Sequence, residues 1–240
     1  MWSICMKEIR QFFSNLTGYI ALLLFLLVNG MYLFLLQDSS ILEYGYATLD
    51  QFFQLAPWVL MFLIPAIAMR SFSDEFRTGT FETLKTRPLT ATQIVSGKYF
   101  SVLGVMLVVI IPTFLYVFTI QSLSTTGQID GGGIAGSYFG LFFLAAVFAA
   151  ISVCCSSFTS NAVVSFLVSA FACLIVYYGF NALSALPVFS GNADYYIEML
   201  GIDFHYRSIS RGVLDTRDVI YFLSMIVLFL FITIKNVHKK

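Results

Sequence analysis

The chain has 240 residues, of which 59% are hydrophobic and only 11% are charged, and its formal net charge is zero. Soluble domains carry about 25% charged residues. The composition is therefore that of an integral membrane protein and excludes a single large soluble core. The balanced charge gives no indication of a nucleic acid or another polyanion as partner.

Residues 2–16 predict a helix that lies on the membrane surface. Apolar side chains recur there at steps of three and four, and they are Trp2, Cys5, Ile9, Phe12, Phe13 and Leu16. Lys7 and Arg10 fall on the opposite side, where they can reach the lipid head groups. A plain cytoplasmic extension of the first span is the alternative.

Six apolar segments follow that reach or approach the ~20 residues needed to cross a bilayer. The predicted spans are residues 18–36, 52–69, 99–120, 134–155, 162–183 and 219–234. Pro57, Pro65 and Pro112 lie inside two of them, as membrane helices tolerate. Residues 121–133 are predicted to be a loop that ends in three glycines. The expected fold is an all-α integral membrane protein with six transmembrane helices in a single domain, residues 1–240.

The positions of the bases predict the orientation of these spans. Six spans put both termini on one side of the membrane, together with the polar stretch 70–98, and ten of the 13 Lys and Arg residues lie on that side. The other three are Arg207, Arg211 and Arg217. Because bases accumulate in cytoplasmic loops, we expect both termini and the polar stretch to be cytoplasmic.

The polar stretch predicts a short helix from Asp74 to Thr86. Ser73 can cap its start, and Gly79 predicts a bend or a division into two parts. Pro88 then stops the helix. Such a helix can dock in a groove of a soluble partner, or the stretch can be a solvated loop. The residues alone favour neither.

Two patterns are absent from the sequence. There is no GxxxxGK[ST] loop, so the chain cannot hydrolyse ATP by that mechanism. No charged residue lies inside the spans as predicted, which weighs against an ion-coupled carrier. We expect no metal site, and we expect His205 to lie in a loop. Two possibilities remain: transport that is driven by a separate motor protein, or a role that involves no transport.

The polar stretch resembles the hallmark of ABC-2-type transporter permeases. The likeness lies in an acidic-basic pair, a Gly-Thr, a following Glu and Leu, and a closing Pro, and the residues are Glu75, Arg77, Gly79, Thr80, Glu82, Leu84 and Pro88. A second likeness, to the outer loop and the entry to the last span, rests on Arg211, Gly212 and Asp215. Within the family, overall length and likeness are nearest to the gliding-motility-associated permease subunits. The modest outer loop departs from exporters with a large extracytoplasmic domain.

The resemblance implies a permease subunit of an ATP-driven exporter in a bacterial inner membrane, linked to gliding motility or surface-protein machinery. It implies cytoplasmic ABC ATPase subunits and a second permease subunit, identical or related, as partners. The first seven residues above would form the coupling helix that contacts the ATPase. ATP and Mg would bind to that ATPase, so this chain would hold no cofactor and would not itself be an enzyme.

Two other functions remain open at this point. The chain can be a membrane anchor or assembly subunit of a surface machine that transports nothing, or a stand-alone secondary carrier. The outer segment 194–218 is likewise open to two interpretations. It can be a gate for an apolar or lipid-linked cargo, or else a structural lid or a contact for an accessory protein, and the second interpretation is favoured.

Overall fold

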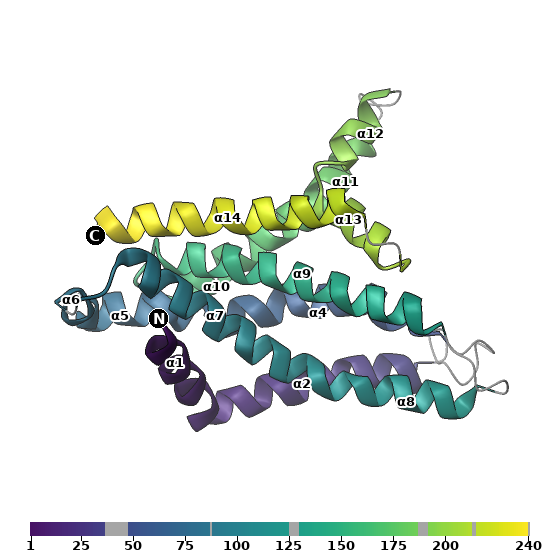
Figure 1. Cartoon of the computed structure of the whole chain (residues 1–240), viewed down its shortest axis with the longest axis horizontal. Coiled ribbons are helices and arrows are strands. Elements are labelled where there is room, and N and C mark those ends of the chain that lie inside the picture. Colours follow the sequence, from purple (N-terminus) through teal and green to yellow (C-terminus); the bar gives the residue numbers. More distant parts are fainter. Residues whose placement is uncertain (37–47, 87, 125–129, 187–191, 213–214, 240) are drawn as a thin grey trace.

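The computed structural model of the chain describes residues 1–36, 48–86, 88–124, 130–186, 192–212 and 215–239 (Figure 1). Within these ranges every regular element is a helix. Five helices are long and apolar enough to cross a membrane, and they are Asp50–Thr78, Ala91–Leu123, Gly131–Ser156, Ala162–Ser184 and Thr216–Lys239. The expectation of an all-α fold built from apolar spans is confirmed at this level.

The N-terminal region folds into two helices, α1 (Trp2–Ser14) and α2 (Leu16–Phe34). The helices Trp2–Ser14 and Gly18–Phe34 meet at an angle of 74° and form a sixth span only if they are taken together. Six spans therefore stay a prediction. α1 packs along α7 (Ala91–Ile110) and buries Ile4 and Cys5, whereas Trp2 and Leu16 of the predicted apolar stripe are exposed.

The second span runs further than its apolar sequence. α4 (Asp50–Ala68) continues almost directly into α5 (Arg70–Thr78), which is followed by α6 (Thr80–Lys85). The polar stretch therefore begins as an extension of a span. Inside α4, Pro57 lacks the N–H that would bond the Phe53 carbonyl. The hydroxyl of Tyr206 donates to that carbonyl instead, at 2.7 Å.

The third span is bent at a proline. α7 ends at Ile110, a single 3₁₀ turn covers Ile111–Thr113 around Pro112, and α8 follows (Phe114–Leu123). The helix starts well before the predicted span, because Thr90 and Gln93 form a capping box there. Lys98 consequently lies inside α7, one residue before the predicted start of the span.

α9 (Gly131–Ser156) is the central helix and packs against α4, α7, α10 and α14. Its alanines and glycines allow this close approach of neighbouring helices. The expectation that the three glycines end a loop was wrong, because α9 begins at Gly131. The side chain of Asp130 caps the helix by accepting from the backbone N–H of Gly133, at 3.0 Å.

The last third of the chain contains one broken span, two short helices and one long span. α10 (Ala162–Leu174) passes through a π-helical turn (Ile175–Gly179) into α11 (Phe180–Ser184). α12 (Asn192–Glu198) and α13 (Ile202–Ile209) are short, and α14 (Thr216–Lys239) is longer than the predicted 219–234 at both ends. His205 was expected in a loop, but it is buried within α13.

The molecule has two distinct ends. Both termini lie at the same end as α5 and α6, which we call the terminal end, whereas α12 and α13 lie toward the other, the distal end (Figure 1). The three bases predicted to face the side opposite the termini, Arg207, Arg211 and Arg217, flank or belong to α13 and α14 at the distal end.

Candidate functional site

The predicted partner-binding helix is divided into two at Gly79. This glycine has φ +69, in the left-handed region, and it ends α5. α6 then turns back, and its Phe81 is buried against the ring of Phe76, with ring centroids 4.9 Å apart. The apolar side of α6 thus packs on α5, and its polar side is left at the surface. The expected cap at Ser73 was wrong, because Ser73 lies inside α5.

The seven residues predicted for this region divide into an exposed and an inward-facing group. The exposed residues, which we call the α5–α6 surface, are Arg77, Gly79, Thr80, Glu82 and Pro88. The other two, Glu75 and Leu84, face inward: Leu84 packs against the hydrophobic core, and the Glu75 side chain is only 15% exposed. Five of the seven are therefore exposed, in α5, at Gly79, in α6 and at Pro88 beyond α6.

Glu75 belongs to a buried charge cluster that joins three helices. Its Oε1 lies 2.8 Å from Nζ of Lys98 in α7, and Oε1 of Glu8 in α1 lies 3.1 Å from the same nitrogen. Lys98 Nζ also donates to the carbonyl of Ser71. The side chain of Lys98 is fully buried. α1, α5 and α7 are therefore held together by one cation.

The charges of this cluster make the contact between the three helices sensitive to the loss of any one partner. Three partners match the three donors of an ammonium group, so Lys98 is fully satisfied. One positive and two negative charges leave a net charge of −1, and Oε2 of Glu75 is buried without a hydrogen-bond partner among the described residues. Buried charges of this kind contribute little net stability while paired, but the loss of one partner is costly.

A serine of the central helix caps α5 from outside. The hydroxyl of Ser156, the last residue of α9, accepts from the backbone N–H of Phe72 at 3.0 Å and of Ser73 at 3.3 Å, and donates to the Met69 carbonyl at 3.1 Å. The N–H groups of Phe72 and Ser73 lie in the first turn of α5, where intrahelical acceptors are scarce, whereas the Met69 carbonyl also accepts from the Ser73 hydroxyl. The cap fixes the direction of α5 relative to α9.

The C-terminal span is hydrogen-bonded to the same region, where α9 contacts α5. Nδ2 of Asn236 in α14 donates to the carbonyl of Ser157 at 2.7 Å and contacts its hydroxyl oxygen at 3.0 Å. Ser157 directly follows the capping Ser156. The start of α5 and the ends of α9 and α14 are thus joined by hydrogen bonds. A displacement of α5 would be transmitted to the central helix.

The predicted outer motif serves close packing at the distal end. Gly212 has φ +83, and a Cβ at this position would lie 2.8 Å from Cα of Gly133. Arg211 is exposed and donates from Nε to the Arg207 carbonyl at 3.1 Å. Asp215 accepts from the backbone N–H of Arg217 at 2.9 Å, near the start of α14. The glycine therefore has a structural role, whereas both charged side chains contact only nearby residues of the described chain, Asp215 also accepting from the Thr216 hydroxyl at 3.5 Å.

Sequence reasoning missed a buried histidine–carboxylate contact in the same region. Nδ1 of His205 lies 2.7 Å from Oδ1 of Asp218, and Nε2 lies 2.9 Å from the Met199 carbonyl. The pair connects α13 to the first turn of α14. Both imidazole nitrogens are engaged, so His205 has the geometry of a structural residue, which favours the interpretation of the distal segment as a lid.

One sequence signal could have revealed the role of Lys98. The pattern Thr90-x-x-Gln93 is a capping box, and it starts a helix two turns before Lys98. With Ile94 and Val95 in the first turns, the apolar face of this helix begins before the lysine. A lysine within the apolar face of a helix requires a buried partner. No comparable signal identifies Glu8 or Ser156 as partners.

A comparison with protein families identifies a matching family. The family model described as ABC-2 family transporter protein matches residues 8–189. The matched segment starts at the Glu8 of the buried cluster and includes α5, α6 and the central helix α9. A search of the curated proteins gives no match.

Proposed function

The chain belongs to the ABC-2 family of transporter proteins, and on this premise we propose that it is the permease subunit of an ATP-driven exporter whose ATPase binds the α5–α6 surface. It is a multi-pass membrane protein by its family and its apolar helices. The observation that carries the proposal is the continuity of α4 with α5, which places an exposed polar surface at the end of a membrane span.

The described contacts give this surface a mechanical route into the membrane. A force on α6 acts on α5 through the packed rings of Phe76 and Phe81. From α5 it reaches α7 and α1 through Lys98, and α9 through Ser156. α5 would act as a rigid lever, because a helical rod transmits displacement whereas a flexible loop does not.

The remaining parts of the assembly follow as part of the same proposal. ATP and Mg would bind to two cytoplasmic ATPase subunits, and this chain would supply no catalytic group. A second permease subunit, identical or related, would complete the membrane part. The positions of the bases support a cytoplasmic terminal end in a bacterial inner membrane. A link to gliding motility rests on sequence likeness alone.

The experiment is a charge reversal on the α5–α6 surface. Glu82 is exposed on α6, so Glu82→Lys should leave folding and membrane insertion intact. We expect it to reduce the stimulation of ATP hydrolysis by about ten-fold, the loss of a charge-assisted contact. The measurement uses the ATPase that co-purifies with the tagged chain from native membranes, reconstituted in lipid vesicles.

The control is Asp194→Lys, the same reversal in α12 at the distal end. It should leave ATPase binding and stimulation unchanged. Equal stimulation by the wild-type chain and Glu82→Lys would refute the proposed contact. Hydrolysis that never responds to any exported material would instead favour an anchoring subunit, and the absence of any co-purified ATPase would favour a stand-alone carrier.

A further inference from the structure

A cavity of about 720 Å³ lies between α1, α2, α4, α5, α7 and α10, on the side where the bent N-terminal helices meet the second span. This volume falls within the range of about 300–1,000 Å³ found for small-molecule sites. No residue of the α5–α6 surface lines it, and it has no part in the proposed ATPase contact.

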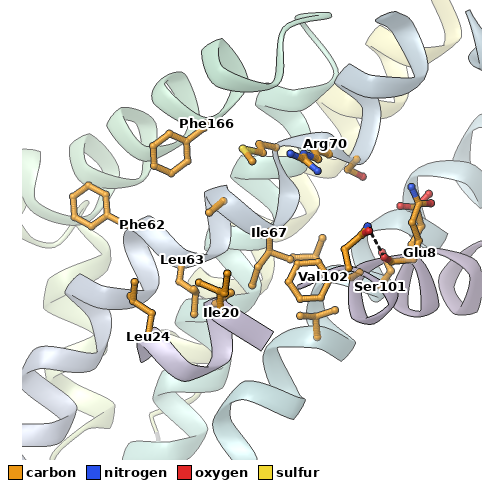
Figure 2. A pocket seen from close by; sticks show the side chains of 18 of the residues that line it. Glu8, Ile20, Leu24, Phe62, Leu63, Ile67, Arg70, Ser101, Val102 and Phe166 are labelled. Atoms are coloured by element: carbon orange, nitrogen blue, oxygen red, sulfur yellow. Dashed lines mark hydrogen bonds between the residues drawn. The ribbon is translucent and has the colours of Figure 1, made fainter. Parts of the chain in front are cut away.

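The lining of the cavity changes from apolar to polar along its length. Figure 2 shows Leu24, Phe62 and Phe166 at one end and Arg70 and Glu8 at the other. The apolar wall is accessible from the surface, because the side chains of Leu24 and Phe62 are 52% and 53% exposed. In a membrane-spanning chain such a wall contacts acyl chains, and the polar end lies next to α5, at the terminal end.

The polar end presents both signs of charge to the cavity. Arg70 and Asp74 lie one helical turn apart on α5, and both line the cavity. Residues at this spacing on a helix commonly pair. Here Asp74 contacts Arg77 at 3.6 Å instead, and Arg70 forms no ion pair with any described residue. A free guanidinium and a partly exposed carboxylate therefore stand side by side.

We propose that the cavity binds a phospholipid with a zwitterionic head group that carries a primary ammonium, such as phosphatidylethanolamine. The guanidinium of Arg70 would bind the phosphate, since it offers planar paired donors. The carboxylate of Asp74 would accept from the ammonium, and the acyl chains would lie along Leu24 and Phe62. This inference depends on membrane insertion but not on an ATPase partner, so the two proposals fail separately.

The only two tryptophans of the sequence permit a direct test, because Trp58 lines the cavity and Trp2 does not. In a Trp2→Phe background, the full chain is reconstituted in vesicles of phosphatidylcholine. Lipids with brominated acyl chains then replace part of the bilayer and quench Trp58 on contact. We expect brominated phosphatidylethanolamine to bind about five-fold more strongly than brominated phosphatidylglycerol or phosphatidylcholine, the equivalent of one partly exposed ion pair.

A second reporter position distinguishes the cavity from the general lipid-facing surface. Phe118 in α8 is 66% exposed and does not line the cavity. In Trp2→Phe, Trp58→Phe, Phe118→Trp, quenching should show no preference among the three lipids. An equal preference at both positions would mean that the selectivity does not come from the cavity, and would overturn the proposal.

Two variants test the two contacts of the head group. Asp74→Asn should abolish the preference for phosphatidylethanolamine, and Arg70→Gln should weaken quenching by all three phospholipids relative to brominated diacylglycerol, which has no phosphate. Arg10→Gln on exposed α1 is the control and should change neither result. A preference for phosphatidylglycerol would overturn the assignment of the head group. Absence of quenching by any lipid would overturn lipid binding.

Discussion

The terminal and distal ends of this protein both bury polar groups, but they do so in different ways. At the terminal end, Lys98 holds two carboxylates in a cluster of net charge −1, and the neighbouring α5–α6 surface stays exposed. At the distal end, His205 pairs with Asp218, and Gly212 packs directly on the backbone of α9.

The difference indicates which end is built to move. A partner that brings charge near the cluster changes its electrostatic balance, so the energy of the cluster depends on binding. Backbone contacts at a glycine have only one arrangement, since a shift of a few tenths of an ångström already costs packing. We therefore interpret the terminal end as the part that responds to a partner and the distal end as the fixed closure.

Replacement of the cation at the centre of the cluster should have the largest effect. Lys98→Met leaves Glu8 and Glu75, whose side chains are 20% and 15% exposed, side by side without a counter-charge, and we expect it to cost about 3 kcal/mol in the free energy of unfolding. Arg77→Met is the control, because its ion pair with Asp74 is long and solvent-exposed, and should cost less than about 1 kcal/mol. Titration with SDS measures both, and equal values would remove the contrast between a buried joint and an exposed surface.

Two glycines with positive φ test the contrast between the ends directly. Gly79→Ala meets nothing within 4 Å and should cost about 1–2 kcal/mol for the left-handed backbone alone. Gly212→Ala has the same backbone cost and also brings Cβ to 2.8 Å from Cα of Gly133, so we expect about 2–4 kcal/mol. The comparison uses the midpoint of thermal unfolding in one detergent. A smaller loss in Gly212→Ala than in Gly79→Ala would contradict a tightly packed distal end.

The spans and the break at Gly79 could be predicted from the sequence because they rest on local properties. Long apolar runs require burial in lipid, and a glycine after Thr78 permits the left-handed turn. The start of α9 could not be predicted in this way. Glycine has a low helix propensity, and the close approach of Gly212, which explains the glycine at position 133, is visible only in the folded structure.

In the candidate site, too, some residue positions follow from local sequence properties and others do not. The exposed positions of Arg77, Thr80 and Glu82 follow from their polarity on a short helix that leaves the membrane. The burial of Glu75 does not, because it depends on Lys98, which in turn pairs with Glu8, 90 residues earlier. Pairing between residues so far apart in the sequence depends on how the helices pack, and a single sequence does not reveal this packing.

Tyr206→Phe is expected to have an intermediate effect at the distal end. It removes the donor to the Phe53 carbonyl, which Pro57 leaves without a backbone partner, and should cost about 1–2 kcal/mol. Burial raises the pKa of Tyr206 well above its usual value, so the phenol stays a donor at all ordinary pH. The second change Pro57→Ala restores a backbone N–H at this position and should recover part of the loss.

Titration of the four proteins with SDS completes this double-mutant cycle. The coupling energy should be about 1 kcal/mol in favour of the double variant. Tyr196→Phe, on the exposed side of α12, is the control and should have no effect. If the changes in unfolding free energy from Tyr206→Phe and Pro57→Ala are simply additive, the Tyr206 hydroxyl does not compensate for the N–H that Pro57 lacks. The proposed contact between α13 and α4 would then be wrong.

Ser156→Ala is the smallest change and addresses the link between the two ends. It removes the acceptor for the backbone N–H groups of Phe72 and Ser73, and a lost helix cap costs about 1 kcal/mol. Because the lost contacts lie at the junction of α4, α5 and α9, we expect faster amide hydrogen exchange in the first turn of α5 and little change in α13. Ser210→Ala, whose hydroxyl donates to the Arg207 carbonyl at 3.2 Å at the distal end, should leave α5 unaffected. If amide exchange in α5 is unchanged in Ser156→Ala, the Ser156 contacts do not fix the direction of α5. Force from the α5–α6 surface would then have to reach the rest of the molecule through Lys98.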